Sequence, residues 1–156
     1  EHTYNIDKNI CWIIVGDGRM KTWIENQVKM KKLDRCVKFL GRHCFHPDTS
    51  IILKNGLSCA MKNLKLQDVL LDGSVVEKVI QIFNTHQEHF YRFSLNVNGD
   101  DILVTGTHMI YDNNKDTFVM VKDHPDSEKT DIVSDYLMCI STNTNHIPIN
   151  EYVFWD

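Results

Sequence analysis

Three turn dipeptides, Asn55-Gly56, Asp72-Gly73 and Asn98-Gly99, punctuate the middle of this 156-residue sequence. An Asn-Gly or Asp-Gly pair between apolar runs is a strong local signal for a β-hairpin. The apolar runs that these turns separate are short and partly alternating, as in strands with one buried face. We therefore expect a mainly β fold from Cys44 to the end of the chain, where residues 136–141 and 146–156 form the last two strands.

The first part of the sequence has a different pattern. The apolar run Ile10–Val15 has the length of a buried strand, and a glycine-containing turn ends it. Between Met20 and Leu33 the apolar residues recur at near-helical spacing, and Cys36–Gly41 has the composition of a second strand. The order strand, helix, strand predicts a β-α-β unit within residues 1–43.

Composition excludes several classes of function. The sequence is 42% hydrophobic and 24% charged, which is typical of a globular protein. The net charge is −4 without a basic block, so we expect no nucleic-acid partner. No apolar run approaches the ~18 residues of a membrane span, and no signal peptide precedes Ile10, so we expect a cytoplasmic monomer without a membrane partner. Because Glu1 rather than Met opens the sequence, we expect a piece of a longer chain.

The five cysteines are odd in number and form no C-x-x-C pair. This spacing argues against both a zinc site and a disulfide framework, so no metal is expected. For Cys11, Cys36 and Cys59 the simplest interpretation is a reduced thiol that packs as a small apolar side chain. Cys44 differs because of the residues around it.

Several short motifs follow one another after residue 43. Cys44-Phe45 precedes Asp48-Thr49, and the segment Leu64–Leu70 has the pattern L-x-x-x-D-V-L. Thr105 and His108 then form T-x-x-H directly after an apolar strand. In this order and spacing the motifs resemble the Hint module that inteins share with hedgehog autoprocessing domains.

The resemblance covers residues 44–156, about seven tenths of the chain. It implies a Hint-type β-fold, and an autocatalytic activity that needs no cofactor and has the flanking polypeptide of the same chain as its substrate. Gln67 stands where the family usually has a glycine. We expect little consequence, since a turn at this position does not strictly require a positive φ.

The residues at this motif permit cleavage of the peptide bond between His43 and Cys44. The Cys44 thiolate attacks the carbonyl of His43 through a five-membered ring, and this N-to-S acyl shift gives a thioester. His108 is the candidate proton donor to the leaving nitrogen, because histidine titrates near neutral pH. Thr105 is the candidate that holds the peptide or the oxyanion. The matching residues of Hint modules take these roles.

Three later residues complete the predicted site. Cys139 falls where many Hint modules have an aspartate and some a cysteine, so it either assists amide activation or acyl transfer, or packs in the core. His146 falls at a late histidine that many inteins use, or else it only caps a strand. The chain ends in Trp155-Asp156 where a splicing intein usually has His-Asn. Asp156 offers only a carboxylate, so it either forms a hydrolysable anhydride or precedes further sequence.

Residues 1–43 resemble the start of the donor-nucleotide half of Rossmann-like retaining glycosyltransferases. The resemblance rests on the strings I-V-G-D-G and V-x-F-L-G. Gly16 and Gly18 are therefore weak candidates for phosphate binding, or else they only permit the strand-to-helix turn. The segment is interpreted as the end of a host protein, with His43 as its last residue.

Three functions are compatible with the sequence. The first is a Hint-type self-cleaving or splicing module that carries part of its host. The second is a β-domain that keeps the Hint shape and binds or supports without chemistry. The third is a glycosyltransferase fragment that carries an insertion. The sequence that flanks this chain would decide the third possibility. If glycosyltransferase sequence resumed after the module, the module would be an intein inserted in that host.

Overall fold

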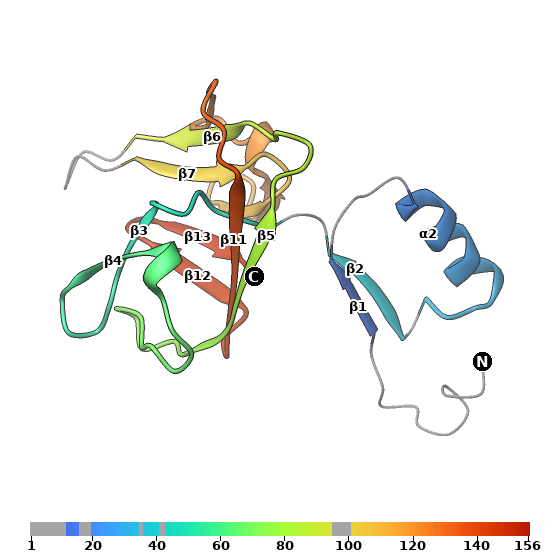
Figure 1. Cartoon of the computed structure of the whole chain (residues 1–156), viewed down its shortest axis with the longest axis horizontal. Coiled ribbons are helices and arrows are strands. Elements are labelled where there is room, and N and C mark those ends of the chain that lie inside the picture. The colour runs from blue at the N-terminus through green and yellow to red at the C-terminus, as the bar shows by residue number, and fades with distance from the viewer. Residues whose placement is uncertain (1–11, 16–19, 35, 41–42, 95–100) are drawn as a thin grey trace. The chain divides into compact units, whose positions relative to one another are not determined.

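The computed structural model of the chain describes residues 12–15, 20–34, 36–40, 43–94 and 101–156. The chain divides into two compact units, residues 1–42 and 43–156 (Figure 1). His43 therefore belongs with the C-terminal unit, one residue earlier than the sequence suggested. In the described parts of both units, no helix has the length and apolar character needed to cross a bilayer.

The N-terminal unit is a strand, a helix and a strand. Strand β1 (Trp12–Val15) pairs in parallel with β2 (Val37–Leu40), and helix α2 (Lys21–Met30) lies between them in the sequence. Two parallel neighbouring strands need such a crossover connection. The strand–helix–strand order predicted from the sequence is therefore present. The likeness to a Rossmann-type sheet stays a prediction, and Gly16 and Gly18 lie outside the described residues.

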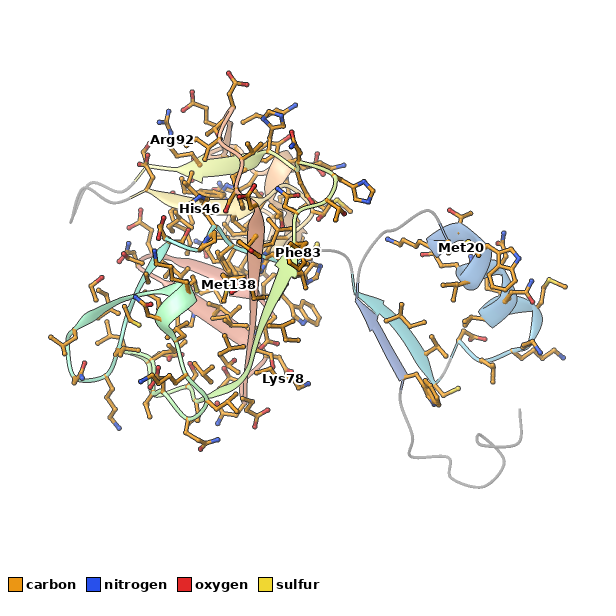
Figure 2. All side chains as sticks on the ribbon, in the orientation of Figure 1. Met20, His46, Lys78, Phe83, Arg92 and Met138 are labelled. Carbon is orange, nitrogen blue, oxygen red and sulfur yellow. A yellow bond between two sulfur atoms is a disulfide. The ribbon has the colours of Figure 1, made fainter. Side chains whose placement is uncertain are left out.

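Helix α2 buries little apolar surface. Val28 is buried, whereas Trp23 is 57% exposed and Met30 is 76% exposed. Met20, at the N-terminal end of the helix in Figure 2, is also exposed and provides no side-chain cap. Two strands and one helix are too few elements to cover both faces of a parallel sheet.

The C-terminal unit consists of short, mainly antiparallel strands with two 3-10 turns. In chain order its elements are β3 (Ser50–Ile52), β4 (Ser58–Ala60), η1 (Met61–Asn63), β5 (Val76–Phe83), β6 (Phe90–Phe93), β7 (Ile102–Thr105), β8 (Met109–Asp112), β9 (Thr117–Met120), η2 (Val121–Asp123), β10 (Glu128–Lys129), β11 (Tyr136–Thr142), β12 (His146–Ile149) and β13 (Tyr152–Trp155). The mainly β fold predicted from the turn signals is therefore confirmed.

The strands pair in four groups. β3 pairs with β4, and the long strand β5 pairs with β11 over its whole length, with a register shift between Ser141 and Thr142. The other two groups have the strand orders β10-β6-β7 and β12-β13-β8-β9. Four of these pairs are hairpins between consecutive strands, whereas β5–β11, β6–β10 and β8–β13 join segments distant in sequence. The first and last parts of the unit meet in one core (Figure 1).

The predicted turns are largely present. Gly56 and Gly73 have φ of 81° and 93°, and the Asn55 side chain accepts a hydrogen bond from the amide of Leu57. Asn98-Gly99 lies outside the described residues. The prediction of one strand over 146–156 was wrong, because this segment folds into the β12–β13 hairpin. Asn150 adopts a φ of 54° there, a left-handed conformation that asparagine tolerates well.

The short segment from Cys44 to Thr49 positions the site. Phe45 forms bridges with Val104 of β7 on one side and with Met138 of β11 on the other. It exchanges both backbone hydrogen bonds with Met138, at 2.7 and 2.9 Å, and Met138 lies in the middle of the C-terminal unit (Figure 2). Thr49 fastens the same segment to β7, because its hydroxyl donates to the carbonyl of Leu103 and accepts from its amide.

The expectation for Gln67 was wrong. Its φ is 71°, in the left-handed region that costs an L-residue about 1–2 kcal/mol relative to glycine. Its amide donates to the carbonyl of Val76 in this conformation, so the turn before β5 depends on the positive φ. The glycine that the family usually has at this position suits the turn better than the glutamine does.

Gln67→Gly is therefore expected to stabilise the C-terminal unit by about 0.5–1 kcal/mol. This net value is the relieved strain of about 1–2 kcal/mol less about 0.5–1 kcal/mol for the greater freedom of glycine in the unfolded chain. Thermal unfolding measures the change. Gln81→Gly is the matched control in the extended strand β5, where glycine should destabilise by a similar amount. A fall in stability for both variants would contradict the role of φ at Gln67.

Candidate active site

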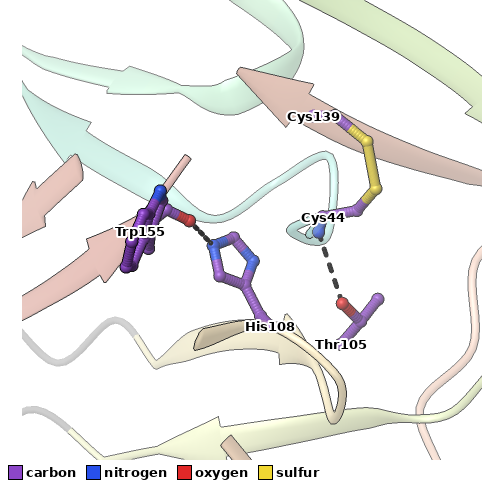
Figure 3. The surroundings of a disulfide bond; sticks show 5 residues. All are labelled: Cys44, Thr105, His108, Cys139 and Trp155. Atoms are coloured by element: carbon purple, nitrogen blue, oxygen red, sulfur yellow. Dashed lines mark hydrogen bonds between the residues drawn. A yellow bond between two sulfur atoms is a disulfide. The ribbon is translucent and has the colours of Figure 1, made fainter. Parts of the chain in front are cut away.

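Cys44 lies opposite Cys139 because of the register that Phe45 sets. Phe45 and Met138 form the hydrogen-bonded pair of an antiparallel ladder, so Cys44 and Cys139 form the adjacent pair without hydrogen bonds. In such pairs the Cα atoms are close, and here they are 4.4 Å apart. The two sulfurs form a disulfide across 95 residues of sequence (Figure 3).

This disulfide corrects the expectation drawn from the cysteine count. An odd number of cysteines excludes complete pairing, but one pair has formed and it includes the predicted nucleophile. Cys36 and Cys59 are free thiols, buried and half-buried respectively, as expected of apolar packing residues. Burial raises the pKa of the Cys59 thiol. Cys11 lies outside the described residues.

Thr105 holds the main chain of Cys44 on both sides. The Cys44 amide donates a hydrogen bond of 3.3 Å to Oγ1 of Thr105, and the Thr105 amide donates one of 2.9 Å to the carbonyl of Cys44. Both residues are fully buried. The nitrogen held in this way belongs to the His43–Cys44 peptide bond, so Thr105 is placed to hold the peptide, one of the two roles expected of it.

His108 lies beside the same peptide in an aromatic enclosure. Its ring is stacked on that of His43 at a centroid distance of 5.2 Å, and Phe45 and Phe154 contact it at 4.6 and 5.4 Å. Nε2 is 2.9 Å from the carbonyl oxygen of Trp155. A carbonyl only accepts, so Nε2 carries the proton in the neutral ring and Nδ1 has a free lone pair.

Nδ1 of His108 is buried and has no hydrogen-bond partner within the described residues. Figure 3 shows the ring between the carbonyl of Trp155 and the main chain of Cys44. The proximity of the Cys44 backbone favours the protonated ring. A buried nitrogen without a partner is costly, so its position beside the His43–Cys44 peptide makes it a candidate functional group.

Burial and, to a lesser extent, the neighbouring His43 together lower the pKa of His108 from 6.5 to about 3. The expectation that this histidine titrates near neutral pH was therefore wrong. At pH 7 the ring is neutral, because no carboxylate among the described residues offsets the loss of solvation. Its chemistry in this state is that of a base at Nδ1 that returns the proton it accepts.

The turn between β7 and β8 sets the spacing of Thr105 and His108. The His108 amide donates to the carbonyl of Thr105, and the Val121 amide donates to the carbonyl of His108. Gly106 lies between them against the ring of Tyr91, where an added Cβ would come within 2.6 Å of a ring carbon. A side chain at this position would displace either the ring or the turn.

His146 and Asp156 lie together at another place in the unit. His146 is paired with Trp155 across the β12–β13 hairpin, and its ring stacks on Phe118 at 5.7 Å. The Asp156 carboxylate accepts a hydrogen bond from the amide of Thr142. Burial raises the pKa of Asp156, while Thr142 and His146 act in the opposite direction. Trp155 connects this group to His108 through its carbonyl.

The contacts that hold His108 have no counterpart in the sequence motifs. The backbone carbonyl of Trp155, rather than its side chain, determines which nitrogen of His108 carries the proton. No sequence signal identifies such a contact, because every residue type has a carbonyl. Phe45 and Phe154 were foreseeable only as core residues. Within the described residues, no group of three or more histidine, cysteine or acidic side chains is arranged to hold a metal ion.

Solved structures of an intein are similar to this chain. The crystal structure of the gp41-1 intein matches with a TM-score of 0.55 and 12% identity, over 73% of this chain and 98% of the intein. A variant of it with three substitutions matches with a TM-score of 0.56 and 13% identity, over 73% and 99%. No family model matches the sequence, and no curated protein matches it significantly. The chain therefore shares the fold of these inteins, and the predicted Hint-type fold is confirmed in that respect.

Proposed function

We propose that this chain cleaves its own backbone between His43 and Cys44 by an N-to-S acyl shift. The observation that carries the proposal is the environment of one peptide nitrogen. Thr105 accepts the hydrogen bond of that nitrogen, and the free lone pair of His108 lies beside the same residue. The fold shared with inteins is consistent with this chemistry.

The step is an isomerisation that needs no cofactor. The Cys44 sulfur, once its thiol is free, forms a bond to the carbonyl carbon of His43, and the bond from that carbon to the Cys44 nitrogen breaks. The thiol proton passes to Nδ1 of His108 and from there to the departing nitrogen, which becomes an amine. Because sulfur, carbonyl and nitrogen belong to adjacent residues, the attack is unimolecular and is favoured by proximity.

The neutral state of His108 suits this transfer. A permanently charged imidazolium would have no lone pair to accept the thiol proton. The neutral ring has one at Nδ1, and the Trp155 carbonyl prevents the tautomer that would lose it. Thr105 restrains the peptide while the ring exchanges the proton, which is the positioning that general acid–base catalysis requires.

The fate of the thioester depends on the second group of residues. Asp156 and His146 lie at the end of the chain described here, and the Trp155 carbonyl links them to His108. This arrangement suits a second cleavage that involves Asp156, with hydrolysis or transfer to another nucleophile as the alternatives. We further propose that the substrate is the polypeptide that flanks residues 44–156, and that the module acts as a cytoplasmic monomer.

Release of residues 1–43 by dithiothreitol tests the proposal. The dithiol reduces the disulfide of Cys44 and then intercepts the thioester, so two fragments should replace the full-length mass within a single incubation. The rate should rise with pH, because the thiolate is the reactive form of both cysteine and dithiothreitol. Intact-mass measurement at several pH values detects both fragments.

The alternative function is a β-domain that keeps the fold and lacks the chemistry. An unchanged full-length mass after reduction, for a chain whose circular dichroism shows it folded, would establish this alternative. The glycosyltransferase fragment gains no support from the comparisons and stays a prediction from the sequence of residues 1–43.

A further inference from the structure

We infer that Cys139 is a redox site that locks the nucleophile: its disulfide with Cys44 holds the module inactive until a thiol attacks the Cys139 sulfur. This inference rests on the proposed function. It assigns to Cys139 the control of cleavage, and it names a small thiol or dithiol as the activating reagent.

The first argument is the occupancy of the reactive sulfur. A sulfur in a disulfide has no thiolate and cannot attack the carbonyl of His43. The Cys44–Cys139 bond therefore removes the only nucleophile placed one residue after that carbonyl. The remaining contacts of the site, from Thr105 to the Cys44 amide and from Trp155 to His108, are formed with the disulfide in place (Figure 3). The lock thus leaves the site assembled.

The second argument is the unequal exposure of the two sulfur-bearing residues. Cys44 is 0% exposed and lies with Phe90 and Leu137 in a small apolar cluster. Cys139 is only partly buried at the edge of that cluster, where it pairs with Ile80 of β5. Attack on a disulfide depends on access, so an external thiolate reaches the sulfur of Cys139 first.

The direction of attack decides which cysteine is released. A thiolate forms a bond to the Cys139 sulfur, the bond between Cys139 and Cys44 breaks, and its electron pair leaves on Cys44. A second thiol then reduces the mixed disulfide on Cys139, so that two thiols supply two electrons and end as one external disulfide. Cys44 is thereby set free beside the carbonyl of His43, and once its sulfur has taken up a proton from solvent it has the thiol form from which the proposed acyl shift starts.

The register of β11 makes the lock part of the fold. Because Phe45 exchanges both hydrogen bonds with Met138, the two cysteines remain a close cross-strand pair after reduction. An external disulfide, which is reduced to two thiols in the exchange, can therefore restore the Cys44–Cys139 bond without movement of the backbone, provided that the acyl shift has not occurred. Disulfides of this kind within a reducing compartment are usually transient and redox-sensing.

The first test maps the site of attack. The oxidised chain is treated briefly with a small monothiol such as glutathione, quenched in acid and digested without reduction. The mixed disulfide should be found on the peptide that contains Cys139. Its presence on the Cys44 peptide instead, or its absence after complete loss of the disulfide, would overturn the inference. This readout does not depend on cleavage.

The second test measures release of residues 1–43 with two reagents that separate the steps. Hydroxylamine cleaves thioesters and does not reduce disulfides, whereas a trialkylphosphine reduces the disulfide with water and becomes a phosphine oxide. Hydroxylamine alone should release nothing from the oxidised chain, and hydroxylamine after phosphine should release residues 1–43. Equal release in both arms would overturn the lock.

Variants separate this inference from the proposed function. Cys139→Ala should release residues 1–43 with hydroxylamine alone, whereas Cys59→Ala should keep the need for phosphine. If neither the reduced wild type nor Cys139→Ala releases the fragment, the proposed function fails, and the mapping experiment still decides whether Cys139 is the redox site. If the reduced wild type releases the fragment but Cys139→Ala does not, the comparison of the oxidised and reduced wild type decides whether the disulfide blocks cleavage.

Discussion

Cys44→Ala is expected to abolish release of residues 1–43 at every pH and with every thiol. Alanine has no atom that can form the bond to the carbonyl carbon of His43, and none of the thiols left in the described chain, Cys36, Cys59 and the freed Cys139, directly follows that carbonyl in the sequence. The spontaneous hydrolysis that remains is negligible because amide resonance protects the bond. Intact-mass measurement after overnight incubation with dithiothreitol detects the loss.

Two further variants make this result specific. Cys44→Ser should cleave slowly, because a hydroxyl is a much weaker nucleophile at neutral pH than a thiol. Cys59→Ala removes a thiol of β4 and should leave the rate nearly unchanged. Because Cys44→Ala also removes the disulfide, its thermal unfolding is compared with that of Cys139→Ala, which loses the same bond. Cleavage by Cys44→Ala at the wild-type rate would disprove the proposed nucleophile.

His108→Gln is expected to slow the release of residues 1–43 by roughly 10²–10⁴-fold, the usual contribution of general acid–base catalysis. The glutamine amide can donate to the carbonyl of Trp155 as Nε2 does, so the enclosure should be retained. It cannot accept and return a proton at the position of Nδ1. Single-turnover cleavage of the reduced chain measures the rate. His86→Gln, in an exposed turn, is the matched control and should cleave at the wild-type rate.

The same variant has a consequence for stability. The pKa of His108 is 6.5 when exposed and about 3 in the fold, so the unfolded chain binds a proton between these values and the folded chain does not. The free energy of unfolding is therefore unaffected by His108 above about pH 6.5. It decreases as the pH drops from 6.5 toward 3, by about 4 kcal/mol over this interval. His108→Gln should lose this acid sensitivity. A slower rate with unchanged acid sensitivity would show that the ring is solvated and that the neutral-shuttle mechanism is wrong.

Local sequence patterns determined the class of each unit. Alternation and turn residues such as Gly56 are local properties, so the strands after Cys44 followed from the sequence, as did the strand–helix–strand order before it. The spacing of Thr105 and His108 could also be predicted from the sequence, because both residues belong to one turn. Their proximity to Cys44 followed from the resemblance to Hint modules rather than from any property of the residues between them.

Tertiary pairing alone decided the state of the site. The disulfide follows from one register, Phe45 opposite Met138, which joins segments almost a hundred residues apart and leaves no trace in local sequence. The tautomer and low pKa of His108 follow from a backbone carbonyl, from burial and from the ring of His43. Such quantities depend on solvent exclusion and on partners brought together in space, whereas the sequence specifies only which side chains are available to meet.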